Sequence, residues 1–125
     1  MILDTCALLW LANEQSHFTP DILSRLEQAP AVFVSAITAF EIGVKFQARK
    51  LILPLPPQAW FQQTIEHHGL AVIDLDPSIC LKAAELPPIH RDPCDRFIIA
   101  TALANGLPVV TADSRFEKYG VEVLL

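Results

Sequence analysis

Four acidic residues stand where predicted strands end or predicted helices begin, and they are the residues of this chain best suited to chemistry. They are Asp4, Glu41, Asp95 and Asp113. In an open α/β sheet the carboxyl ends of the strands meet at one edge, where ligand sites usually lie. Mg²⁺ and Mn²⁺ prefer oxygen ligands, and clustered carboxylates repel one another unless a cation is bound. One or two bound ions could activate a water molecule and stabilise charge on a phosphodiester, so the pattern predicts metal-dependent phosphate chemistry.

Each of these acids also has an ordinary structural interpretation. Asp4 could cap the helix that it opens, and Asp95 could be an acid favoured in a first helical turn. Glu41 stands four residues before Lys45, which suits an ion pair on a helix surface, and Asp113 could start a turn. Because no acid is convincing alone, the prediction of one site rests on their joint placement.

Strands and helices are predicted to alternate along the whole chain. The predicted strands are Ile2–Asp4, Val32–Ser35, Ala71–Asp74, Val109–Thr111 and Val121–Leu124. The predicted helices are Thr5–Asn13, Pro20–Gln28, Ala36–Arg49, Gln58–His68, Pro77–Leu86 and Pro93–Ala104. This alternation implies right-handed crossovers and an α/β fold, with a mostly parallel central sheet of four or five short strands and helices on both faces. Asp4 and Asp113 then follow separate strands, while Glu41 and Asp95 enter on helices from the same edge.

Apolar residues in these helices give expectations about packing. Ile37, Phe40 and Val44 keep the three-and-four spacing of a buried helical stripe. We expect core or contact positions for the larger aromatic residues Trp10, Trp60 and Phe61.

Length and composition predict one reduced, cytosolic domain over residues 1–125. Its 52% apolar and 18% charged residues are enough for a buried core. The chain has an odd number of cysteines without CxxC spacing, Cys6, Cys80 and Cys94, and no signal peptide is recognised before them. Both features favour reduced thiols over a framework of disulfide bonds. Cys6 lies near Asp4 without an indicated base, so we expect a small buried apolar residue rather than a catalytic thiol. The apolar run 6–12 is far shorter than the roughly 20 residues that span a bilayer, so no membrane segment is expected.

The formal net charge of −5 argues at first against a nucleic-acid partner, because affinity for phosphates usually comes from Lys and Arg. Without the four candidate acids, which bound cations would neutralise, the charge is only −1. Lys45 and Arg49 continue the helix face of Glu41 and could lead RNA towards the site, or could simply be solvated surface charges.

Four ordered motifs carry a resemblance to a known family. They are Asp4-Thr5 followed by Leu8-Leu9-Trp10-Leu11, the stretch from Val34 to Ile42, Asp92-Pro93-Cys94-Asp95-Arg96, and Val110-Thr111-Ala112-Asp113. Over essentially the whole chain the sequence resembles PIN-domain proteins, and most closely the VapC-type toxins of bacterial toxin–antitoxin pairs. The positions of Cys6, Phe40 and Cys94 are often histidine, tryptophan and phenylalanine in similar toxins, which puts target preference and packing in doubt more than catalysis.

The resemblance implies a PIN-like three-layer sandwich with the activity of an endoribonuclease that depends on Mg²⁺ or Mn²⁺. Its metal site would be formed by the acids Asp4, Glu41, Asp95 and Asp113, with the hydroxyl of Thr111 nearby. It further implies an RNA substrate, products with a 5′-phosphate and a 3′-hydroxyl, a homodimer, and a cognate antitoxin protein that blocks the site.

Three other residues near the motifs have more than one interpretation. Asp92 could be a fifth metal-site acid, but its place before Pro93 favours a helix cap. Arg96 could contact a substrate phosphate or form a structural ion pair. His90 lies in a loop near the predicted site and could meet the substrate. The histidines have no ligand-like spacing, so zinc is not expected.

Two other functions stay open. A non-catalytic PIN-like module could keep its acids and only bind RNA or a protein, and it would show no Mg²⁺-dependent cleavage. A haloacid-dehalogenase-type phosphatase also has an aspartate after its first strand, but it needs a second aspartate two residues later, where this chain has Cys6.

Overall fold

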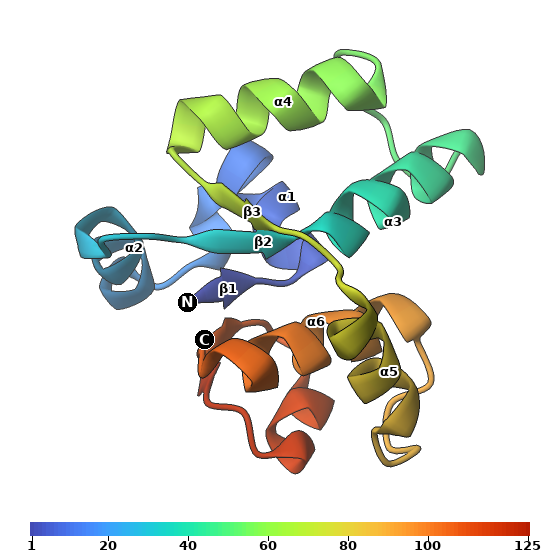
Figure 1. Ribbon diagram of the computed structural model, residues 1–125. Helices are drawn as coiled ribbons and strands as arrows, with labels where there is room; N and C mark the ends of the chain where they lie inside the picture. The colour runs from blue at the N-terminus through green and yellow to red at the C-terminus, as the bar shows by residue number, and fades with distance from the viewer.

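A computed structural model of residues 1–125 has a wholly parallel, five-stranded sheet at its centre (Figure 1). Its strands are β1 (Ile2–Leu3), β2 (Phe33–Ser35), β3 (Ala71–Ile73), β4 (Val109–Val110) and β5 (Val123–Leu124), in the spatial order β3-β2-β1-β4-β5. The register places Leu3 of β1 between Val34 and Val110. The predicted α/β fold with a mostly parallel sheet is therefore confirmed.

The helices follow the predicted order, and their ends differ from the predicted ones by no more than two residues. They are α1 (Thr5–Asn13), α2 (Pro20–Gln28), α3 (Ala36–Gln47), α4 (Pro57–His68), α5 (Pro77–Glu85) and α6 (Pro93–Asn105). Two short 3₁₀ helices were not predicted, η1 (Gln15–His17) and η2 (Ser114–Tyr119). None of the helices combines the length and the hydropathy that a membrane-spanning segment requires.

Side-chain caps followed by proline explain why helix starts could be predicted. Thr19 accepts the amide hydrogen of Ile22 before Pro20, and Asp76 accepts that of Ile79 before Pro77. Proline suits a first helical position, because its missing N–H would have no intrahelical partner there. Glycine explains one of the helix ends in the same way. Helix α6 stops at Gly106, which has a φ of 63°, a backbone conformation that glycine adopts without strain.

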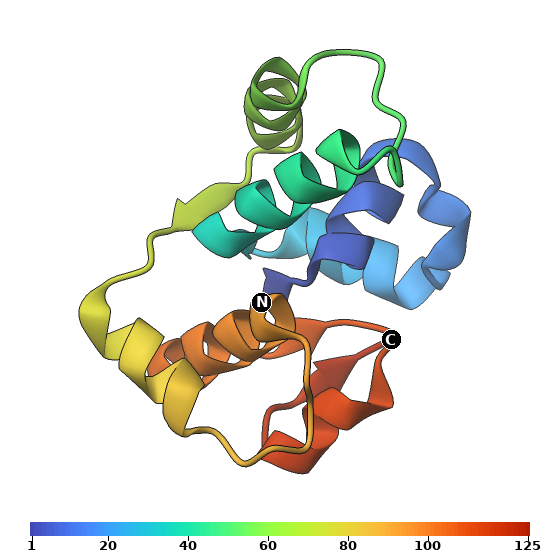
Figure 2. The ribbon, with the colours of Figure 1, turned by 90° about the vertical axis from the view of Figure 1, so that its right-hand side faces the viewer.

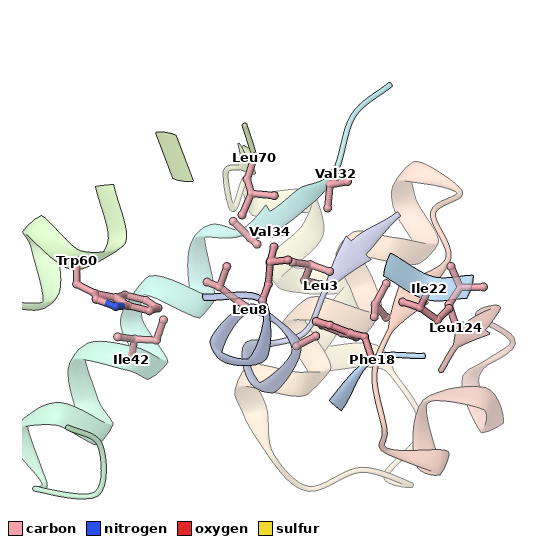
Figure 3. Packing of buried hydrophobic residues seen from close by; sticks show 13 residues of the cluster. Leu3, Leu8, Phe18, Ile22, Val32, Val34, Ile42, Trp60, Leu70 and Leu124 are labelled. Carbon is pink, nitrogen blue, oxygen red and sulfur yellow. The ribbon is translucent and has the colours of Figure 1, made fainter. Parts of the chain in front are cut away.

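The alternation of side chains along the strands divides the core between the two faces of the sheet. On one face, Leu3, Val34, Val110 and Leu124 pack with buried residues of α1, α2 and α4 (Figure 3). On the other face, strand residues such as Ile2 and Val109 pack with α6 and η2. The two views of the ribbon show these helical layers on opposite sides of the sheet (Figures 1 and 2), which confirms the three-layer arrangement.

The expected buried stripe of α3 is wrong at two of its three positions. Ile37 is buried, but Phe40 and Val44 have exposed fractions of 61% and 48%. Helix α3 continues from the carboxyl end of β2, beyond the sheet, and the side that carries Phe40 and Val44 is left exposed. The covered part of the helix carries Ile42, which belongs to the same buried cluster as Trp60 of α4 (Figure 3), together with the polar residues Thr38 and Glu41. Apolar spacing alone could not indicate a buried side that is partly polar.

Candidate metal and active site

All four candidate acids line one pocket of about 390 Å³ at the carboxyl edge of the sheet. Asp4 follows β1 and Asp113 follows β4, while Glu41 enters on α3 and Asp95 on α6. Strands β1 and β4 are adjacent, and the chain adds later strands outward from each of them in opposite directions. Such a switch point is where open α/β sheets usually form ligand sites. The other lining residues are Thr5, Cys6, Trp10, Lys45, Asp92, Ala112 and Arg115.

Asp4 has a structural role in addition to its place in the pocket. Its Oδ1 accepts the amide hydrogen of Ala7 at 2.8 Å and caps α1, as the ordinary interpretation predicted. Its Oδ2 accepts the hydroxyl hydrogen of Thr111, which follows β4. Burial raises the pKa of Asp4, and the charges of Glu41 and Asp113 raise it further, while the two hydrogen bonds oppose the shift. Asp4 therefore joins two strands at the bottom of the pocket.

Glu41 reaches the pocket from the buried side of α3. Its Oε1 accepts the hydroxyl hydrogen of Thr5 at 2.7 Å, and its Oε2 lies 2.8 Å from Nζ of Lys45. The Thr5 hydroxyl also lies 3.3 Å from that of Thr38. A hydroxyl has a single hydrogen, so Thr38 is the donor to Thr5 when Thr5 donates to Glu41. The predicted ion pair with Lys45 is present, but it lies within the pocket and not on an open helix surface.

Asp95 and Asp113 have opposite electrostatic environments. Burial raises the pKa of Asp95 to about 7, helped by the charges of Asp92 and the other pocket acids. Arg115 contacts both carboxylate oxygens of Asp113, with Nε 2.9 Å from Oδ1 and Nη2 2.7 Å from Oδ2. These hydrogen bonds hold the pKa of Asp113 well below its usual range. Near neutral pH, Asp113 is therefore ionised, whereas the surroundings of Asp95 favour its protonated form.

A buried histidine touches both of these acids. His90 is 2% exposed, and its Nε2 lies 2.9 Å from Oδ2 of Asp113, within a hydrogen bond, and 3.0 Å from Oδ2 of Asp95. Its Nδ1 accepts the amide hydrogen of Asp92 at 3.2 Å. The sequence placed His90 near the predicted site, and the structure brings its ring against two acids of that site, although His90 itself does not line the pocket.

Asp92 and Arg96 have structural contacts in this structure. Asp92 caps α6 by accepting the amide hydrogen of Cys94 at 2.9 Å, as its position before proline predicted, and it also lines the pocket. The predicted ion pair of Arg96 is absent, because its guanidinium contacts no acid, while a contact with a substrate phosphate stays a prediction for a side chain that does not line the pocket. It donates to five backbone carbonyls, those of Ala83, Ala84, Leu86, Pro87 and His90. Arg96 therefore caps the carboxyl end of α5 and fixes the loop that carries His90.

Replacing Arg96 with lysine should lower the free energy of unfolding by about 2 kcal/mol, because one amine cannot reach carbonyls on both sides of the guanidinium. Urea unfolding followed by circular dichroism would measure the change. Arg25→Lys, at an exposed position of α2, is the matched control and should change stability by less than about 0.5 kcal/mol. Equal stability of the two variants would show that these contacts contribute little.

The expectation that Cys6 is buried is wrong. Cys6 is exposed and lines the pocket, because the buried side of α1 is formed by Ala7, Leu8 and Leu11. Partial desolvation and the charge of Asp4 raise the pKa of the Cys6 thiol. Burial likewise raises the pKa of Cys94 to about 11. Neither cysteine has the lowered pKa of a nucleophilic thiol, so the prediction against thiol chemistry agrees with the structure.

The pocket has the composition of a site for a hard cation. Its lining holds five acidic side chains and only two basic ones, Lys45 and Arg115. Burial is the main cause of the raised pKa values of Asp4 and Asp95, and the charges of the neighbouring acids add to it. A divalent cation would supply the missing charge, and carboxylate oxygens are the ligands that Mg²⁺ and Mn²⁺ prefer. The four predicted acids therefore fit such an ion, and their assignment as its ligands stays a prediction.

Sequence analysis missed the contacts that support the acids. Thr5 stands there only as part of a motif, and no role was predicted for Arg115. Trp10 was expected to be a core or contact residue, and it lines the pocket while its ring stacks on that of His17, with centroids 4.7 Å apart. The one sequence signal for the supporting roles of Thr5, His90 and Arg115 is that each stands within a few residues of a predicted acid.

Comparison with known proteins agrees with this arrangement of fold and acids. The PIN domain family matches residues 1–122. The chain belongs to the PIN-domain family. A curated relative of this PIN domain, Ribonuclease VapC22 from Mycobacterium tuberculosis, is 30% identical over 120 residues, which cover 95% of this chain and 91% of the relative. The predicted likeness to VapC-type proteins is thus confirmed.

Solved structures share the fold of this PIN domain. A structure of VapBC2 from Rickettsia felis bound to a promoter DNA fragment has a TM-score of 0.73 at 17% identity, covering 98% of this chain and 96% of that chain. DNA-bound VapBC from Salmonella typhimurium has a TM-score of 0.67 at 23% identity, covering 98% and 95%. At such identities the likeness shows the fold alone, and it supports the predicted PIN-like sandwich.

Proposed function

We propose that this PIN domain is a metal-dependent endoribonuclease and the toxin of a VapC-type toxin–antitoxin pair. The observation that carries the proposal is the pocket into which the sheet and two helices direct Asp4, Glu41, Asp95 and Asp113. The curated relative that is 30% identical over nearly the whole chain is named a ribonuclease, which supports RNA as the substrate class.

Each acid has a role in this proposal. Asp4, Asp95 and Asp113 would bind Mg²⁺ or Mn²⁺, and Glu41 would bind it directly or through water and orient the attacking water. The ion would supply an activated water molecule and would stabilise the charge that develops on the phosphodiester. Thr111 holds Asp4 through its hydroxyl, and Thr5 holds Glu41. These hydrogen bonds limit the movement of the carboxylates, which favours a fixed arrangement of ligands.

Two basic side chains suit the substrate. Lys45 and Arg115 line the same pocket, and each is anchored by one of the acids at 2.7–2.8 Å. We propose that they donate hydrogen bonds to phosphate oxygens of the RNA, since charge-assisted bonds of this kind are strong. Their position within the pocket explains how a chain with a net charge of −5 could still bind RNA locally.

We also propose a cognate antitoxin and a homodimer. The similar solved structures are described as VapBC complexes. Phe40, directly before Glu41, and Val44, one turn after it, are exposed apolar side chains of α3, and exposed apolar surface can mark a protein contact. An antitoxin there would block access to the pocket. RNA as substrate places the proposed action in the cytoplasm.

Metal-dependent cleavage of RNA tests the proposed function. Total bacterial RNA, which contains transfer, ribosomal and messenger RNA, would be incubated with the protein and Mg²⁺, Mn²⁺ or EDTA, and the RNA ends sequenced. We expect discrete cuts with either ion, none with EDTA, and products with a 5′-phosphate and a 3′-hydroxyl.

Other outcomes would contradict the proposal in distinct ways. Binding of RNA without any Mg²⁺-dependent cut would indicate the non-catalytic module. Hydrolysis of p-nitrophenyl phosphate with all RNA intact would indicate a phosphatase. Cleavage that persists in EDTA and leaves 2′,3′-cyclic phosphates would show a reaction without the proposed metal chemistry.

A further inference from the structure

His90 is a buried side chain in contact with two of the proposed metal-site acids. We propose that His90 is a positioning residue, which holds Asp95 and Asp113 in place for the metal ion and is not itself a ligand. This inference rests on the proposed function, because it concerns the same metal site. Its basis is the set of hydrogen bonds around the imidazole ring.

The contacts of the two ring nitrogens determine the tautomer. Nδ1 of His90 lies 3.2 Å from the backbone nitrogen of Asp92, which has only a hydrogen to offer, so Nδ1 is the acceptor. In a neutral ring the hydrogen then lies on Nε2. Nε2 is the atom within 2.9 and 3.0 Å of Oδ2 of Asp113 and Oδ2 of Asp95. A protonated nitrogen cannot bind a metal ion, although His90, Asp95 and Asp113 have potential ligand atoms within 4.8 Å of one another.

The surrounding structure fixes the ring in this orientation. The backbone N–H of His90 donates to the Tyr119 hydroxyl at 2.7 Å, and its carbonyl accepts from Arg96 at 3.2 Å. The ring packs edge-to-face against Phe116, with centroids 5.7 Å apart. The backbone, one ring nitrogen and the ring face of His90 are therefore all constrained, and this leaves the Nε2 hydrogen directed at the acids.

The consequence for the site is electrostatic and geometric. Asp95 and Asp113 come from α6 and from the segment after β4, and their like charges repel one another. A single N–H donor beside both Oδ2 atoms offsets part of this repulsion and keeps the two carboxylates together before an ion arrives. Outer contacts of this kind typically change metal affinity by about 10–100-fold when they are removed.

Mn²⁺ binding to the whole protein without RNA tests the role of His90. Isothermal titration calorimetry would compare the wild type with His90→Gln and His90→Leu. Glutamine can place an N–H near the position of Nε2, whereas its amide is a poor ligand for a transition metal. We expect His90→Leu to bind Mn²⁺ about 10–100-fold more weakly and His90→Gln to stay within about threefold of the wild type.

A matched control separates local from general effects. His67→Leu changes an exposed histidine of α4 that does not line the pocket, and it should bind Mn²⁺ as the wild type does. Wild-type affinity in His90→Leu would overturn the proposal. Equal loss in folded His90→Gln and His90→Leu would also overturn it, because it would indicate a ring nitrogen that binds the ion. Failure of the wild type to bind Mn²⁺ would contradict both this inference and the proposed function.

Nitrogen-15 NMR of the wild-type imidazole tests the proposal without any variant that could fail to fold. We expect a protonated Nε2 and an unprotonated Nδ1, both before and after saturation with Mg²⁺ or Zn²⁺. Loss of the Nε2 proton on addition of either ion would overturn the proposal, because it would make His90 a ligand.

Discussion

Asp95→Asn should make the metal-free protein more stable at pH 8 while it abolishes RNA cleavage. The carboxyl of Asp95 has a pKa of about 7 in the folded protein against an ordinary value of 3.8, and burial among other acids is the cause. Because the folded state holds this proton more tightly than the unfolded chain, Asp95 lowers stability as the pH rises from about 4 to about 7, and the full penalty applies above pH 7. Asparagine has no charge to bury.

The expected gain in the free energy of unfolding at pH 8 is about 1–3 kcal/mol, seen as a rise of about 5–10 °C in Tm. It should shrink as the pH falls and vanish near pH 4, where the carboxyl is protonated in both states. Cleavage with Mg²⁺ should fall by at least roughly 1000-fold, because a metal ligand contributes several kcal/mol of charge stabilisation. Thermal unfolding in EDTA from pH 4 to pH 8, together with cleavage rates, would measure both effects.

The control is Asp74→Asn, at an exposed acid after β3 that does not line the pocket. Its stability should differ from that of the wild type by less than about 0.5 kcal/mol at every pH. Added Mg²⁺ should raise the Tm of the wild type and of this control, but not that of Asp95→Asn, because an ion that binds only the folded state stabilises it. A destabilised Asp95→Asn at pH 8 would show that the Asp95 charge is compensated without metal.

The sequence was sufficient for the fold because its local signals agree with one another. Thr19-Pro20, Asp76-Pro77 and Asp92-Pro93 mark helix starts by cap and proline chemistry, which does not depend on distant residues. The strands were predicted slightly too long. Thr111, for example, follows β4 directly, but its hydroxyl already bonds to Asp4 and to the backbone of Asp113. The helix η2 was missed because a short 3₁₀ turn has no apolar period.

The candidate acids were also predictable, because strand order brings the residues after β1 and β4 to one edge. The supporting contacts were not, since they depend on side-chain directions that spacing does not encode. Arg96 illustrates this: next to a pocket acid in the sequence, it turns away to the carbonyls of α5. Cys6 and Phe40 were misplaced for a related reason, as the covered sides of α1 and α3 follow from where each helix leaves the sheet.

Asp4→Asn and Asp4→Ala should separate the structural role of Asp4 from its chemical role. Asparagine keeps an oxygen that can accept the amide hydrogen of Ala7, and asparagine caps helices about as well as aspartate. We expect Asp4→Asn to change the free energy of unfolding by less than about 1 kcal/mol, because removal of a buried carboxylate with a raised pKa offsets the altered contact with Thr111. Its RNA cleavage should nevertheless fall by at least roughly 1000-fold.

Alanine removes the cap of α1 and leaves the buried hydroxyl of Thr111 without its acceptor. Asp4→Ala should therefore lose about 2–3 kcal/mol of stability in addition to all cleavage. Urea unfolding in EDTA and Mn²⁺ titration would compare the two variants at the same pH. Equal destabilisation of Asp4→Asn and Asp4→Ala would contradict this expectation. It would show that the negative charge of Asp4 stabilises the fold, and not only its two hydrogen bonds. Cleavage by Asp4→Asn at the wild-type rate would remove Asp4 from the proposed metal site, because a neutral amide at the centre of the pocket cannot supply the charge that a divalent cation requires.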